Sequence, residues 1–151
     1  MSIDLSYIEK VEVDLNKLRK NLNKINSWKL EIQVLKEKLN SYSVQGFNTY
    51  KSSGVVTLDD ILVRDETRVN ILESNLDFTN YKLNEYKAYL EILNENECEV
   101  INRRYLDITC KRTSYKQIGE DMHYSHTTVK RWNDSAIKKI AEYKYGNIDI
   151  T

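Results

Sequence analysis

The sequence contains no proline and only four glycines among its 151 residues. These two residue types disfavour helix interiors more than any others, so few positions in the chain oblige a helix to end. Charged residues make up 30% of the sequence, a proportion that suits long exposed helices better than sheets. The composition therefore predicts an all-α fold.

Residues that carry metal, redox or catalytic chemistry are equally scarce. Cys98 and Cys110 are too few for a disulfide framework and form no Cys-x-x-Cys pair. His123 and His126 have no cysteine or acidic residue at metal-ligand spacing. The chain also has no glycine-rich phosphate loop and no nucleophile motif. We therefore expect no metal, no cofactor and no enzymatic activity.

Long hydrophobic runs are absent too. No apolar stretch approaches the roughly 18 residues that a membrane span requires. The N-terminal MSIDLSYIEK lacks the basic region and apolar run of a secretion signal. Together with two cysteines typical of reduced thiols, this favours a soluble cytoplasmic protein with no membrane partner.

The charges balance overall but are distributed unevenly. The chain holds 23 Lys and Arg against 23 Asp and Glu. Residues 98–151 carry 10 of the basic and 7 of the acidic residues, so the basic excess lies in the C-terminal third. This asymmetry permits nucleic-acid binding at that end without requiring it.

The apolar pattern of residues 1–94 predicts two long helices, at about 4–42 and 58–94. A capping box of Ser6 and Glu9 would start the first. Its apolar stripe comprises Ile8, Val11, Leu15, Leu18, Leu22, Ile25, Trp28, Ile32, Leu35, Leu39 and Tyr42. Residues 43–57, SVQGFNTYKSSGVVT, hold two glycines and three serines and are expected to form a linker.

The second helix has a stricter heptad row, which consists of Leu62, Val69, Leu76, Leu83 and Leu90. The adjoining row holds Leu72, Tyr86 and Leu93, with Asp65 and Thr79 as polar exceptions that weaken a seam or fix its register. Both stripes are typical of a coiled coil. A helical hairpin within one chain and a homodimer through this half fit the pattern equally well.

Residues 95–146 contain two short helical patterns separated only by HYS at 123–125, followed by a tail at 147–151. In SYKQIGEDMHYSHTTVKRWND, the first pattern offers Ile118 and Met122 to a core, with the small Gly119 where a second helix would cross. The second pattern offers Val129 and Trp132 to the same core. These offsets predict a helix-turn-helix.

Local signals at the predicted turn support this interpretation. Ser114 and Gln117 can form a capping box for the first helix, and Ser125 can cap the second. His123 occupies the position that glycine usually takes, and histidine tolerates a positive φ better than most residues. Tyr124 is expected to pack on Val129 across the cap.

The residues left exposed on the predicted second helix are suited to DNA. Lys and Arg can donate to guanine or to phosphates, and threonine can meet a thymine methyl group or a phosphate. Free amides and basic side chains before the first helix suit a backbone phosphate. The candidate DNA-binding residues are Lys111, Arg112, Ser114, Lys116, Ser125, His126, Thr127, Thr128, Lys130 and Arg131.

The C-terminal third resembles region 4 of the sigma-70 factors. The matching stretches are VINRRY at 100–105, SYKQIGEDM at 114–122, the serine cap and AIKKIAEY at 136–143. Nothing in the first half resembles the sigma region that binds the −10 element. A long coiled half, a Gly/Ser break and a region-4-like tail together resemble the phage late-gene activators of the RinA and ArpU type. The resemblance implies a phage or prophage regulator that binds double-stranded promoter DNA and contacts host RNA polymerase.

Two other interpretations stay open. Phage small terminase subunits also join a helix-turn-helix to coiled coils, and they would form rings of many copies. A region-4 mimic would instead occupy RNA polymerase without touching DNA. Oligomeric state separates the first alternative from an activator, and DNA binding separates the second.

Overall fold

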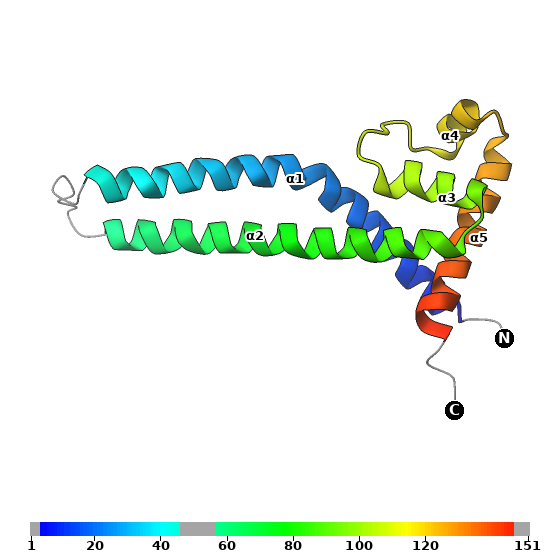
Figure 1. Cartoon of the computed structure of the whole chain (residues 1–151), viewed down its shortest axis with the longest axis horizontal. Helices are drawn as coiled ribbons and strands as arrows, with labels where there is room; N and C mark the ends of the chain where they lie inside the picture. Colours follow the sequence, from blue (N-terminus) through cyan, green and yellow to red (C-terminus); the bar gives the residue numbers. More distant parts are fainter. Residues whose placement is uncertain (1–3, 46–56, 147–151) are drawn as a thin grey trace. The chain divides into compact units, whose positions relative to one another are not determined.

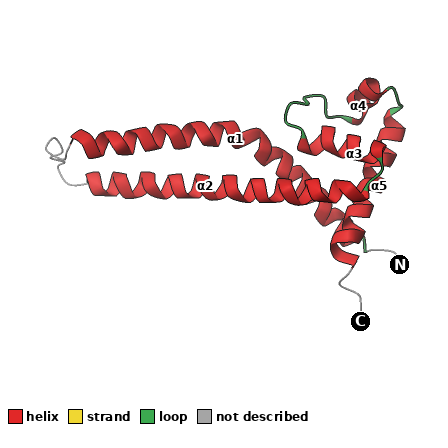
Figure 2. Cartoon of the chain, viewed as in Figure 1, coloured by secondary structure: helices red, strands yellow, loops and turns green. Residues whose placement is uncertain are grey.

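The computed structural model describes residues 4–45 and 57–146, and across these two ranges it contains helices and connecting loops but no strand (Figure 2). The elements in chain order are α1 (Leu5–Gln45), α2 (Leu58–Tyr89), a 3-10 turn (Leu90–Ile92), α3 (Glu95–Ile101), a π-helical segment (Asn102–Leu106), α4 (Tyr115–Met122) and α5 (His126–Tyr145) (Figure 1). The predicted all-α class is confirmed.

The two long helices differ from their predicted bounds at three ends. α1 begins at Leu5 because the Asp4 side chain accepts from the amide of Ser6 at 3.0 Å, so the predicted cap at Ser6 is wrong. α1 continues to Gln45, and α2 ends at Tyr89, five residues before the predicted end at 94. The predicted tail at 147–151 and most of the predicted linker, residues 46–56, lie outside the described residues.

The chain divides into two compact units at points other than the predicted boundary after residue 94. Residues 1–23 and 81–151 form one unit, and residues 24–80 form the other. The beginning of α1 and the end of α2 belong to the first unit, and the ring of Tyr7 stacks on that of Tyr145 while the ring of Tyr89 packs edge-on against that of Tyr143.

In the unit of residues 24–80, α1 and α2 run side by side in opposite directions (Figure 1). Val69 and Leu72 are buried, while Trp28 is half-buried. Ion pairs flank the seam, with Arg68 Nε at 2.9 Å from Glu31 and Lys36 Nζ at 2.8 Å from Glu73. The seam of this unit therefore closes within one chain.

The two polar exceptions of the second heptad pattern are both buried in this seam. Asp65 is 4% exposed and forms an ion pair with Lys38 at 3.3 Å. Thr79 is 1% exposed, and its hydroxyl has no hydrogen-bond partner among the described residues. A buried hydroxyl without a partner destabilises the folded state, because its hydrogen bonds to water are lost on folding and are not replaced.

Thr79→Val is expected to raise the free energy of unfolding by about 1 kcal/mol, because valine fills the same volume without the unpaired hydroxyl. Thr67→Val is the matched control, since Thr67 lies on the same helix and is exposed. Urea denaturation of the two variants and the wild type measures the difference. Equal effects of the two substitutions would contradict the assignment of Thr79 to the seam.

In the unit of residues 1–23 and 81–151, a polar cluster joins α1, α2 and α5. The Tyr86 hydroxyl donates to Asp14 at 2.9 Å, and Lys144 approaches both Asp14 at 3.4 Å and Glu85 at 3.2 Å. Burial and the neighbouring Asp14 raise the pKa of Tyr86. The cluster fixes the C-terminal half of α5 against the two long helices.

A second polar cluster anchors α3. The Asn94 side chain accepts from the amide of Glu97, and Glu97 in turn accepts from the amide of Asn94, so the two form a capping box. Glu97 is 1% exposed and also accepts from Ser135 Oγ at 2.5 Å and Lys139 Nζ at 2.7 Å. One carboxylate therefore starts α3 and holds it against α5.

Candidate nucleic-acid interface

The α4–α5 pair is built by the local signals that the sequence predicted. Ser114 and Gln117 form the capping box of α4, and Ser125 caps α5 by accepting from the amide of Thr128 at 3.2 Å. His123 adopts the left-handed conformation, with φ 66° and ψ 42°. The predicted caps and the positive φ are thus confirmed, and α4 ends at Met122 for the predicted reason.

Gly119 of α4 lies close to the turn that leads into α5. A Cβ atom at this position would lie 2.5 Å from the carbonyl oxygen of Tyr124. Val100, Ile118 and Val129 form the buried cluster beneath the crossing, with Met122 and Trp132 packed against it. The apolar positions therefore pack as predicted, whereas the small residue meets the turn before α5 and not the middle of the crossing helix.

The contact predicted for Tyr124 differs in the structure. Its ring packs edge-on against Trp132, with centroids 4.7 Å apart, and the Tyr124 side chain is 48% exposed. Trp132 lies three residues beyond Val129 and packs against the buried cluster. Tyr124 therefore packs on the indole ring of Trp132, which offers a larger apolar surface than the side chain of Val129.

The face of α5 opposite this cluster is exposed and mainly basic. The predicted residues His126, Thr127, Lys130 and Arg131 are all exposed. Thr128 is half-buried, and its hydroxyl lies 2.9 Å from that of Ser125, so both hydroxyls take part in the cap. Their oxygens are therefore less available to a ligand than those of Thr127.

A shallow groove of about 520 Å³ runs along this face. Its lining residues are Thr127, Lys130, Arg131, Asp134, Ser135 and Lys138. Lys138 extends the basic surface two turns beyond Arg131 and was not among the residues predicted from the sequence. The signal was present, because positions 127, 131, 134 and 138 recur at the helical period.

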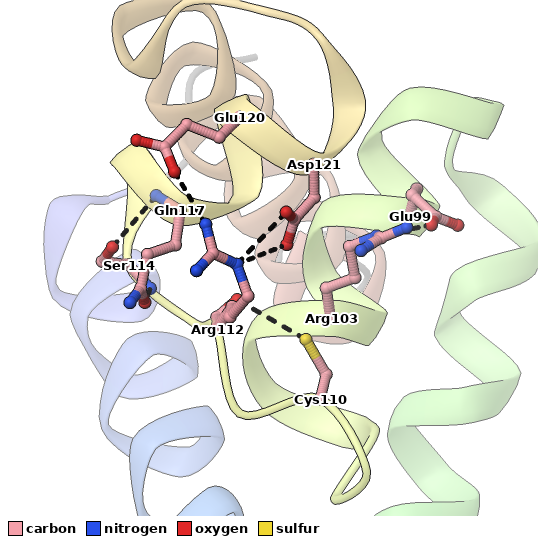
Figure 3. Close-up of polar contacts among 8 residues, drawn as sticks. All are labelled: Glu99, Arg103, Cys110, Arg112, Ser114, Gln117, Glu120 and Asp121. Atoms are coloured by element: carbon pink, nitrogen blue, oxygen red, sulfur yellow. Dashed lines mark hydrogen bonds and ion pairs between the residues drawn. The ribbon is translucent and has the colours of Figure 1, made fainter.

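The basic residues before α4 lie in two different environments. Lys111 is exposed and forms no hydrogen bond or ion pair with the residues that the structure describes, and Lys116 is likewise exposed. Arg112 is also exposed, but its guanidinium lies 2.7 Å from Glu120 and 3.0 Å from Asp121 (Figure 3). A hydrogen bond with Asp121 is the main cause of a raised pKa for Arg112.

These ion pairs reduce the positive potential that Arg112 can offer to a ligand. Glu120 and Asp121 belong to α4. Figure 3 also shows the cap of this helix, where Ser114 accepts from the amide of Gln117 at 3.1 Å. The carboxylates neutralise the guanidinium locally, and the pairs are exposed enough for water and salt to compete with them. The predicted upstream cluster therefore presents Lys111 and Lys116 openly and Arg112 in a paired state.

Other kinds of site find no support in the described residues. Within 4–45 and 57–146, no group of three or more His, Cys, Asp or Glu side chains is placed to hold a metal ion. None of the described helices is both long and apolar enough to span a bilayer. Comparison of the chain with protein-family models, curated proteins and solved structures gives no match.

Proposed function

We propose that this protein binds double-stranded DNA, with α5 in the major groove and α4 against the backbone. One observation carries the proposal: the capped, N-terminal half of α5 presents Lys130 and Arg131 outward, while Val129 on the opposite side is fully buried. A recognition helix needs this division, because its first turns contact base edges while its other face packs on the preceding helix.

The chemistry of the exposed groove supports the same proposal. Lys130, Arg131 and Lys138 line it with a single carboxylate, Asp134. Arginine and lysine can donate to guanine O6 and N7 or to phosphate oxygens, and Thr127 can contact a thymine methyl group. The groove is open along the helix, as contact with an extended duplex requires.

The biological role that we propose is regulation of transcription at promoters. The resemblance of residues 100–143 to sigma-70 region 4, and of the chain's organisation to the RinA and ArpU activators, supports a phage or prophage late-gene activator. In that role the protein would act beside host RNA polymerase. Selection of bound fragments from the source genome tests this part, because promoter-proximal sites are expected.

Lys130→Ala with Arg131→Ala is expected to weaken DNA binding about tenfold or more, because each good base contact contributes roughly 1–3 kcal/mol. Alanine preserves helix propensity, so the melting temperature should change little. The matched control is Lys24→Ala with Lys29→Ala, which removes two exposed lysines from α1. Fluorescence anisotropy at several salt concentrations measures both variants.

The pattern of weakening distinguishes the two kinds of contact. Removing a base contact relaxes sequence preference, whereas removing a phosphate contact weakens all sequences alike and flattens the salt dependence. If the Lys130 and Arg131 variant binds DNA as tightly as the control, α5 does not read DNA. A polymerase-binding mimic would then be favoured, and pull-down of purified RNA polymerase would test it.

A further inference from the structure

The segment 107–113, between the π-helical segment and α4, forms neither helix nor strand, yet arginine side chains hold it at three main-chain carbonyls. Arg19 of α1 donates from Nη1 to the carbonyl of Asp107 at 2.5 Å and from Nη2 to that of Cys110 at 2.6 Å. Arg104 donates from Nη1 to the carbonyl of Thr113 at 2.7 Å. Side chains from outside the segment therefore determine its course.

The residue type at position 19 suits this task. A guanidinium presents several N–H donors in a rigid plane, so one side chain can satisfy two carbonyls whose relative position is fixed. Inside the segment, the amide of Cys110 donates to Asp107 at 3.2 Å, and the Asp107 side chain accepts from the amide of Thr109 at 2.9 Å. Arg19 therefore adds a second donor to the Asp107 carbonyl and also binds the Cys110 carbonyl, so it joins the two ends of this turn.

The segment carries Lys111 and Arg112, two of the candidate DNA-binding residues, and leads into α4, which the proposed function places against the DNA backbone. Lys111 lies one residue after the second carbonyl that Arg19 holds, and Ser114 begins α4 immediately after the segment. The far end is tied to α4 as well, since the Arg104 guanidinium stacks 4.1 Å from the centroid of the Tyr115 ring. The position of Lys111 relative to the groove of α5 thus depends on both arginines.

From this geometry we infer that Arg19 is a positioning residue for contacts between the segment 107–113 and a DNA phosphate. This inference rests on the proposed function. Arg19 itself is occupied by the carbonyls and acts through Lys111 and the amides that follow. Base contacts would come from α5, whereas the hydrogen bonds of Arg19 go to Asp107 and Cys110. Removal of Arg19 should therefore change affinity and salt dependence but leave sequence preference intact.

The first test uses the protein without DNA. Hydrogen exchange of the Thr109 and Cys110 amides is expected to accelerate in Arg19→Ala, because the turn that protects them loses its external support. Arg19→Lys should give an intermediate effect, since one ammonium cannot serve both carbonyls equally. Lys20→Ala is the control, because it removes an exposed charge at the next position. Unchanged exchange in Arg19→Ala overturns the inference.

The second test titrates the same variants with a duplex that the wild-type protein has selected from a random pool. Arg19→Ala is expected to bind about three- to tenfold more weakly, and the slope of log affinity against log salt should fall by about 0.9 for each phosphate that the variant no longer touches. In a Lys111→Ala background, Arg19→Ala should have a smaller effect than in the wild type, because only the amides after Lys111 then remain to be positioned. Circular dichroism and melting confirm that each variant is folded.

The outcomes separate this inference from the proposed function. If the wild-type protein binds no duplex, both the proposed function and the role of Arg19 are wrong. If binding depends on Lys130 and Arg131 but not on Arg19, only the inferred role of Arg19 is wrong. Faster exchange with an unchanged salt slope also overturns it, because the segment would then be held by Arg19 without contacting a phosphate.

Discussion

Gly119→Ala is expected to lower the free energy of unfolding by about 1–3 kcal/mol, because the added methyl group overpacks the contact between α4 and the turn before α5. The methyl carbon would lie 2.5 Å from the Tyr124 carbonyl oxygen, a main-chain atom that cannot rotate away. The sign of this change is informative, because replacing glycine with alanine in a helix interior otherwise raises the free energy of unfolding by about 1 kcal/mol. Thermal and urea denaturation measure the effect.

Gly146→Ala is the matched control for this variant. A Cβ atom at Gly146 would meet no atom of the described residues within 4 Å, and the residue has right-handed helical angles. Its substitution should therefore be neutral or stabilise by less than about 1 kcal/mol, mainly through the unfolded state. If both alanine variants behave alike, the close approach at Gly119 does not exist in solution.

Glu97→Ala should lower the free energy of unfolding by about 3 kcal/mol, because it removes a buried carboxylate that accepts charge-assisted and capping hydrogen bonds. Ser135 and Lys139 lose their partner on α3, and the capping box with Asn94 is broken. Glu95→Ala is the control, since Glu95 occupies the same first turn and is exposed. Equal destabilisation in the two variants would show that α3 is not anchored through Glu97.

The contribution of Glu97 also depends on pH. Burial raises its pKa, but hydrogen bonds from Lys139, Ser135 and the Asn94 amide outweigh burial, so the pKa lies below the ordinary 4.5. The stabilisation is therefore fully present above pH 4.5 and is lost as the pH falls through the lower folded-state pKa. The stability difference between the wild type and Glu97→Gln should shrink in that acidic range, as denaturation at several pH values would show.

The local features of the α4–α5 pair could be predicted from the sequence because each depends on neighbouring residues. Ser114 and Ser125 cap helices through bonds to residues three positions ahead. His123 is the residue in the turn best able to adopt a positive φ, and it does so. Caps, turns and helical periodicity depend on residues that are close in the sequence, so they can be predicted without knowledge of the tertiary fold.

The seam of α2 was predicted in part. The strict heptad row suggested Leu62 and Leu76 as the buried centre, yet both are only half-buried. Thr79 and Tyr86 of the adjoining row are almost fully buried. Hydrophobicity indicated the correct side of the helix, but the position of the partner helix decides which residues lie at the centre of that side.

Contacts between distant parts of the chain could not be predicted. Arg19 meets carbonyls 88 and 91 residues later in the sequence, and nothing near Arg19 distinguishes it from other basic residues of an exposed helix. The partners of Arg112 were missed for a related reason. Glu120 and Asp121 are close in sequence, but only the course of the segment 107–113 brings their carboxylates to the guanidinium.

The division of the chain into units has a consequence for biosynthesis. The unit that contains α4 and α5 is assembled from residues 1–23 and 81–151, with residues 24–80 inserted between them. A ribosome delivers the N-terminal residues first, so the beginning of α1 must wait for nearly the whole chain before its packing partners emerge. The inserted pair of helices can meanwhile form from local contacts, which close faster than distant ones. We therefore expect a released fragment that ends near residue 80 to hold a folded hairpin but to lack the unit that contains α4 and α5.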